Sequence, residues 1–283
     1  MIKRVGICGS GIMGSGIAEV AAKAGFDVVL RSRHQATADA TIAGLEKSLQ
    51  RQVDKGRLSE EDRDAVLGRV SGTERIADLA DCDLVIESVV EDLATKKALF
   101  LELDHAVKAG AILATNTSTL PVIEMAVETG RADRFCGIHF FNPAPAMSLV
   151  EVVRPLTASD ETIAQAKQFA ADCGKNPVEV ADRAGFIVNA LLFPYLNNAV
   201  RMLENGTASR DDIDTAMKGG CNFPMGPLAL LDLVGLDTSV AILDALYDEF
   251  RDPNYSTVPL LRRMVSAGHL GRKSGRGFYD YQR

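Results

Sequence analysis

Residues 5–14 read VGICGSGIMG, an apolar run that leads into glycines at the spacing Gly-x-Gly-x-x-Gly. The run predicts a β-strand and the residues after it predict a helix, so the glycines occupy the first strand-to-helix turn. There Gly9 permits a tight turn, Gly11 lets the backbone approach a pyrophosphate, and Gly14 lets helix and strand pack closely. The helix N-terminus also offers unpaired N–H groups to phosphate. The alternative is a glycine-rich turn without a ligand, but the position favours a dinucleotide site. Its residues would be Gly9, Ser10, Gly11, Ile12, Met13 and Gly14.

The next strand ends in Arg31, Ser32 and Arg33, without the acidic residue that usually binds the adenosine ribose. The Ser32 hydroxyl can hydrogen-bond a 2′-phosphate, and the two guanidinium groups can neutralise it. The alternative is that both arginines are solvated and the cofactor is ordinary NAD. We therefore expect NAD or NADP as the cofactor, with NADP favoured.

Short apolar runs alternate with helical patterns over residues 1–184, which predicts an α/β fold with a Rossmann-type, doubly wound sheet. Ser59 and Asp62 resemble a capping box, and apolar spacings of three and four predict a pair of helices inserted over about residues 35–68. The expected strands are Arg4–Cys8, Asp27–Leu30, Leu84–Glu87, Ile112–Thr115, Phe135–Phe140, Leu149–Val153 and Val178–Val180.

The β pattern stops at Gly185, and residues 185–283 predict an all-α C-terminal domain that holds a substrate cleft and a dimerisation surface. The first helix is expected over Phe186–Glu204, where Pro194 should kink or interrupt it. Further helices are expected over Asp211–Lys218, Pro227–Val234, Ser239–Phe250 and Leu260–Ala267.

The composition of the 283 residues is that of a soluble globular protein, with 47% hydrophobic and 24% charged residues. A net charge of −7 argues against a nucleic-acid binder. The sequence has no run near the roughly 18 apolar residues of a membrane span. Five scattered cysteines predict neither disulfides nor a metal site. Because the glycines near the N-terminus do not suit the helical core of a secretory signal, we expect a cytoplasmic protein.

One histidine stands out, because His139 lies near the end of an apolar strand at the edge where ligands approach an open α/β sheet. Glu151 lies twelve residues later within another apolar run, where a carboxylate is costly unless it is paired. We expect the two side chains to pair on neighbouring strands, with Glu151 setting the imidazole tautomer and raising its basicity. From the spacing alone, a purely structural pair is an equal alternative.

Several motifs occur together in one order along the whole chain. They are GSGIMGSGIA at 9–18, NTST at 116–119, HFFNPAP at 139–145, GFIVN at 185–189, PMGP at 224–227, GLD at 235–237 and GRKSGRGFY at 271–279. In this the chain resembles the L-3-hydroxyacyl-CoA dehydrogenase family, and within it the short bacterial 3-hydroxybutyryl-CoA dehydrogenases. It departs from the family at Ser32, where NAD-using members carry Asp.

The resemblance implies an oxidoreductase that interconverts 3-hydroxybutyryl-CoA and acetoacetyl-CoA by hydride transfer to NAD(P)⁺. It implies that His139 is the general base or acid and that Glu151 is its partner. Ser118 and Asn189 would hydrogen-bond substrate oxygens. Positions near the cofactor would be Glu91, Lys96, Ser118, Asn142 and Lys273. Contacts to CoA would come from Ser48 and Lys55, and the resemblance also implies a homodimer.

Two other functions stay open at this stage. A dehydrogenase of the same fold could act on a free hydroxy acid or sugar acid, in which case the inserted helices would hold no CoA. A non-enzymatic nucleotide-binding relative is the other alternative, although the joint presence of Ser118, His139, Glu151 and Asn189 disfavours it.

Overall fold

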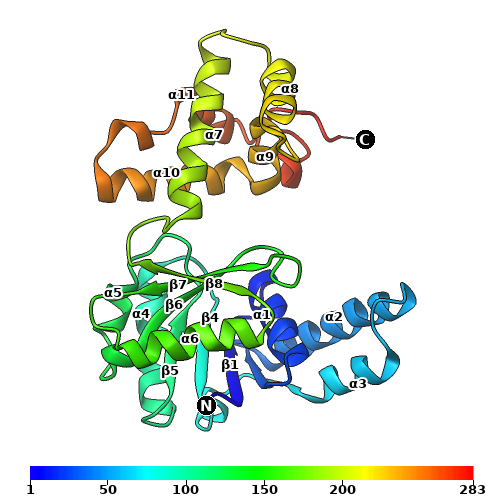
Figure 1. Cartoon of the computed structure of the whole chain (residues 1–283), viewed down its shortest axis with the longest axis vertical. Helices are drawn as coiled ribbons and strands as arrows, with labels where there is room; N and C mark the ends of the chain where they lie inside the picture. Colours follow the sequence, from blue (N-terminus) through cyan, green and yellow to red (C-terminus); the bar gives the residue numbers. More distant parts are fainter. Residues whose placement is uncertain (283) are drawn as a thin grey trace. The chain divides into compact units, whose positions relative to one another are not determined.

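The computed structural model describes residues 1–282, and they form two compact units. The first unit is Met1–Asp182 and the second begins at Arg183 (Figure 1). No helix among the described residues has the length and apolar character needed to cross a membrane.

An eight-stranded sheet forms the centre of the first unit, in the order β3-β2-β1-β4-β5-β6-β7-β8. The strands are β1 (Arg4–Cys8), β2 (Asp27–Arg31), β3 (Val70–Thr73), β4 (Leu84–Glu87), β5 (Ile112–Thr115), β6 (Phe135–Phe140), β7 (Leu149–Arg154) and β8 (Asn176–Ala181). All neighbouring pairs among the described strands are parallel except β6 and β7, which are antiparallel. The carboxyl ends of β1, β4, β5 and β6 therefore meet at one edge of the sheet.

Helices cover both faces of this sheet, and for that reason β4, β5 and β6 are buried at every position. The α-helices are α1 (Ile12–Lys23), α2 (Gln35–Asp54), α3 (Glu60–Gly68), α4 (Leu93–Ala106), α5 (Val122–Ala126) and α6 (Asp160–Asp172). The inserted pair, α2 and α3, lies side by side (Figure 1). As expected, the Ser59 hydroxyl caps α3 by accepting the N–H of Asp62 at 2.9 Å.

The expected α/β fold is confirmed, and each expected strand has a counterpart. One strand was missed, because β3 has the sequence VSGT and Thr73 is its one buried residue. Such a strand carries no apolar run, and it forms because β2 offers it an unpaired edge.

The second unit is helical. Its α-helices are α7 (Val188–Glu204), α8 (Arg210–Cys221), α9 (Pro227–Val234), α10 (Leu236–Phe250) and α11 (Pro259–Ser266). They enclose a separate core that includes Leu196, Val200 and Leu243. The helix α7 continues through Pro194, so the expected interruption does not occur. Pro194 is buried, and the packing of the surrounding core outweighs the one backbone hydrogen bond that proline cannot make.

Candidate active site

The glycine loop between β1 and α1 has a backbone that only glycine fits at two positions. Gly9 has a φ of +126°, and a Cβ there would lie 2.2 Å from the carbonyl oxygen of Ser88. A Cβ on Gly14 would lie 1.9 Å from the carbonyl oxygen of Gly9. At Gly11, in contrast, a Cβ would meet no described atom within 4 Å. The loop thus packs closely against neighbouring backbone at Gly9 and Gly14, whereas the space beside Gly11 is open.

The open part of the loop coincides with the N-terminus of α1. Gly11 is the N-cap residue, and within the described residues no side chain caps this end of the helix. The first-turn N–H groups and the partial positive charge of the helix remain available to an anion. Ile12 is 77% exposed beside them. The residues of this loop therefore fit the pyrophosphate of a dinucleotide.

At the end of β2, the three residues proposed to bind the adenosine side lie in different surroundings. Ser32 is buried, with its Oγ 2.9 Å from the Oγ of Ser10. Arg31 donates from Nε to the backbone carbonyl of Glu74 at 3.2 Å, and Arg33 is exposed. Sequence reasoning missed Glu74, because it follows the strand β3 that was also missed.

His139 and Glu151 lie directly opposite each other on the antiparallel strands β6 and β7. Their side chains pair as expected, with Nδ1 of His139 2.8 Å from Oε2 of Glu151. The exposed fractions of the two residues are 6% and 0%. Because a carboxylate only accepts hydrogen bonds, the pair assigns the ring proton of His139 to Nδ1. Phe141 packs against the imidazole, with ring centroids 4.4 Å apart.

A second buried ion pair lies at the ends of β4 and β5. Nζ of Lys96 lies 2.7 Å from Oε1 of Glu87 and 3.1 Å from Oε2 of Glu91. Burial favours a raised pKa for Glu91, but the Lys96 charge and hydrogen bonds from Thr117 and Ser118 outweigh it, so the pKa of Glu91 is lowered. Nζ of Lys96 therefore lies between the carboxylate groups of Glu87 and Glu91.

Hydrogen bonds connect this network to the strand that carries His139. Ser118 donates its backbone N–H to Glu91 at 3.0 Å. Asn116, two residues earlier, accepts the backbone N–H of Phe140 at 2.8 Å. The structure therefore brings the Ser118 loop and the end of β6 together at one edge of the sheet. Asn142 is exposed in the loop that follows β6.

Sequence reasoning also missed Glu87, although a signal for it exists. Glu87 ends the apolar strand β4 and is fully buried. It accepts hydrogen bonds from Val89, Lys96 and Thr115. An acid at the end of an apolar run requires partners, which is the same argument that identified Glu151.

The remaining predicted residues lie on helices and loops outside these clusters. Ser48 is half-buried on α2, and Lys55 is exposed at the C-terminal end of that helix. In the second unit, Asn189 is buried in the first turn of α7. Lys273 of the same unit is exposed, with Nζ 2.7 Å from Oδ2 of Asp237. The structure places Asn189 and Lys273 within their own unit, and their predicted contacts stay predictions.

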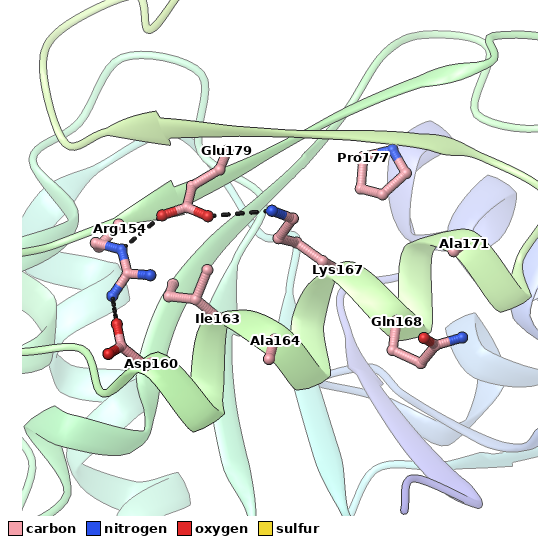
Figure 2. A pocket seen from close by; sticks show the side chains of 9 residues that line it. All are labelled: Arg154, Asp160, Ile163, Ala164, Lys167, Gln168, Ala171, Pro177 and Glu179. Carbon is pink, nitrogen blue, oxygen red and sulfur yellow. Dashed lines mark hydrogen bonds and ion pairs between the residues drawn. The ribbon is translucent and has the colours of Figure 1, made fainter.

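A shallow pocket between α6 and β8 is distinct from these positions (Figure 2). Its charged side chains pair with one another, since Arg154 binds Asp160 and Glu179 at 2.8 Å each. Lys167 also binds Glu179, at 3.2 Å. None of the predicted site residues lines this pocket, and its charges are mutually satisfied. It is not the candidate active site.

Comparisons with known proteins match both units. Residues 4–183 match the family model "3-hydroxyacyl-CoA dehydrogenase, NAD binding domain", and residues 185–281 match "3-hydroxyacyl-CoA dehydrogenase, C-terminal domain". A 3-hydroxybutyryl-CoA dehydrogenase of Mycobacterium tuberculosis is 49% identical over 282 residues, covering 99% of each chain. The crystal structure of (S)-3-hydroxybutyryl-CoA dehydrogenase from Ralstonia eutropha has a TM-score of 0.98, 43% identity and 100% coverage of each chain. A diketoreductase structure has a TM-score of 0.86 and 30% identity, covering 99% of each chain.

Proposed function

Because the chain belongs to the 3-hydroxyacyl-CoA dehydrogenase family, we propose that it interconverts 3-hydroxybutyryl-CoA and acetoacetyl-CoA by NAD(P)-dependent hydride transfer. The observation that carries the proposal is the buried His139–Glu151 pair at the edge of the sheet, with Nδ1 directed at the carboxylate. This pair supplies one proton acceptor, which is the group that oxidation of an alcohol requires from the protein.

In the oxidative direction, His139 would take the proton of the 3-hydroxyl group at Nε2 as the hydride passes from carbon 3 to the bound NAD(P)⁺. The C–H bond breaks, the carbonyl forms, and the imidazole becomes an imidazolium. Glu151 stabilises that positive charge through Nδ1 and keeps the ring oriented. In the reductive direction the same imidazolium returns the proton to the new alkoxide.

The glycine loop would hold the pyrophosphate of the cofactor, and the nicotinamide, when bound, supplies the hydride chemistry. The proposed cofactor contacts are Glu91, Lys96, Ser118, Asn142 and Lys273, as carried over from the resemblance. Ser118 and Asn189 are proposed to contact the substrate, and Ser48 and Lys55 the CoA group. The preference for NADP, expected from Arg31, Ser32 and Arg33, is part of this proposal.

The proposed division of labour assigns cofactor binding to residues 1–184. Residues 185–283 would contribute the substrate cleft and a homodimer surface. The cytoplasmic location and the dimer remain predictions. Size-exclusion chromatography with light scattering tests the dimer directly.

A matched pair of substrates tests the reaction. We expect oxidation of NADH or NADPH with acetoacetyl-CoA, and much lower kcat/KM with free acetoacetate. Turnover of acetoacetate but not of its thioester would instead support a CoA-free dicarbonyl substrate, the second candidate that the diketoreductase likeness favours. Absence of turnover with every substrate would support a nucleotide-binding protein without activity.

A further inference from the structure

The acidic side chain of Glu74, the residue that follows β3, reaches the N-terminus of α2. Oε2 of Glu74 accepts the backbone N–H of Gln35, the first residue of α2, at 3.0 Å. The backbone carbonyl of Glu74 accepts from Nε of Arg31 at 3.2 Å. These two contacts place Glu74 beside the end of β2.

The pairing of the two strands explains this position. Arg31 of β2 lies opposite Thr73 of β3, and Ser32 donates its N–H to the carbonyl of Thr73 at 2.9 Å. Glu74 is the next residue, so it emerges from the same sheet edge as Ser32. In a doubly wound sheet, that edge receives the adenosine half of a dinucleotide.

Glu74 brings a negative charge to a place where the β2 sequence has none. Ser32 stands at the usual position of the acid, and the first turn of α2 contains no acidic residue. The Glu74 carboxylate accepts a hydrogen bond from a first-turn N–H of α2. Without Glu74, this N–H would be available to an anionic group of a ligand. It is exposed, so a ligand can approach it.

We propose that Glu74 is a specificity-determining residue that disfavours cofactors with a 2′-phosphate. The inference rests on the proposed function. Arg31 and Arg33 attract the phosphate, whereas Glu74 repels it and competes with it for the N-terminus of α2. The balance of these charges sets the ratio of NADPH to NADH affinity. The acid that is missing at the end of β2 is thus supplied by the residue that follows the neighbouring strand β3.

The variant Glu74→Gln isolates the charge. A glutamine oxygen can still accept the N–H of Gln35, so the start of α2 is preserved. The matched control is Glu61→Gln, which removes one negative charge from an exposed position in the first turn of α3. Thermal unfolding of both variants checks that the fold is intact.

Calorimetric titration of the full chain with NADH and with NADPH measures the effect without turnover. In Glu74→Gln we expect the ratio Kd(NADPH)/Kd(NADH) to fall at least about tenfold, because NADPH binds more tightly while NADH changes by less than about twofold. Glu61→Gln should leave the ratio unchanged. The effect of Glu74→Gln should shrink at high salt, because ions screen the repulsion.

A structural role for Glu74 would change both dissociation constants together and leave their ratio constant. Binding of dinucleotides with an unchanged ratio in Glu74→Gln would therefore overturn the role of Glu74 alone. Failure of the unmodified chain to bind either dinucleotide would overturn the proposed function together with this inference.

Discussion

The glycine loop and the His139–Glu151 pair lie at the same edge of one sheet, but they are built by opposite means. The loop works by the absence of side chains, since atoms at Gly9 and Gly14 would collide with backbone. The pair consists of two side chains that strands β6 and β7 place opposite each other. Under the proposed function, cofactor binding would depend on the shape of the backbone in the glycine loop, and proton transfer would depend on the side chains of the pair. Substitutions should therefore affect cofactor binding and proton transfer separately.

The largest expected effect is that of His139→Gln. Glutamine has no basic nitrogen, so we expect kcat to fall about 10²–10⁴-fold, the usual contribution of a general base. The dissociation constant of NADH should change by less than about twofold, because the glycine loop is untouched. Steady-state kinetics with acetoacetyl-CoA and fluorescence titration with NADH measure the two quantities.

The control for this variant is His105→Gln, which changes an exposed histidine of α4 whose Nδ1 lies 2.6 Å from the backbone carbonyl oxygen of Leu101. We expect it to retain full activity. If a folded His139→Gln protein bound NADH weakly, NADH binding by the glycine loop would not be independent of proton transfer by the His139–Glu151 pair. The proposed separation of the two roles would then be wrong.

The next effect compares Gly14→Ala with Gly11→Ala. The new Cβ of Gly14→Ala would lie 1.9 Å from the carbonyl oxygen of Gly9, so we expect the free energy of unfolding to fall by about 1–3 kcal/mol and NADH to bind more weakly. In Gly11→Ala the Cβ meets no described atom within 4 Å, so stability should change by less than about 0.5 kcal/mol.

Both glycine variants should weaken NADH binding, but only Gly14→Ala should destabilise the fold. Urea unfolding and NADH titration distinguish the two outcomes. Unchanged NADH affinity in Gly11→Ala would show that the pyrophosphate does not approach the loop at its open part.

The same contrast explains what the sequence could predict. The glycine loop is made of consecutive residues, so its motif can be recognised in the sequence without knowledge of the fold. The His139–Glu151 pair was predictable because a carboxylate within an apolar run needs a partner. The helices of the second unit were predictable from their residue patterns, and the structure shows in addition that Ser209 caps α8 by accepting the N–H of Asp212 at 3.2 Å.

What could not be predicted depends on the sheet as a whole. The strand β3 owes its existence to pairing with β2 rather than to its own residues, and Glu74 was missed together with it. The buried position of Lys96 was also missed, because a long charged side chain is ordinarily exposed. Its burial follows from Glu87, which comes from a different element.

A smaller effect is expected when a negative charge is added at Ser32, which follows β2 on the proposed cofactor side of the site. In Ser32→Asp the new carboxylate can accept hydrogen bonds from ribose hydroxyls and repels a 2′-phosphate. We expect the kcat/KM ratio of NADPH to NADH to fall up to about tenfold, with kcat for NADH nearly unchanged because His139 is untouched. An unchanged ratio would remove the argument that the missing acid at Ser32 influences cofactor choice.

The smallest expected effect is a pH-dependent change in the free energy of unfolding. Glycines do not titrate, so such a change comes from networks of charged side chains. Lys96 and hydrogen bonds from Thr117 and Ser118 outweigh the effect of burial and hold the pKa of Glu91 below its ordinary value. A carboxyl whose pKa is lowered by folding stabilises the fold above its unfolded pKa, about 4.3, and this contribution is lost as the pH falls through the folded pKa.

We therefore expect Glu91→Gln to lower the free energy of unfolding at pH 7 by less than about 1 kcal/mol, because the Glu91 side chain is 40% exposed and solvent screens the pair. The difference from the unmodified chain should shrink as the pH falls below about 4. Urea unfolding at several pH values measures it, with Gly11→Ala as a pH-independent reference. A difference that stayed constant with pH would mean that Glu91 contributes to stability through packing rather than charge. The network at β4 and β5 would then depend on shape, as the glycine loop does, rather than on charged side chains, as the His139–Glu151 pair does.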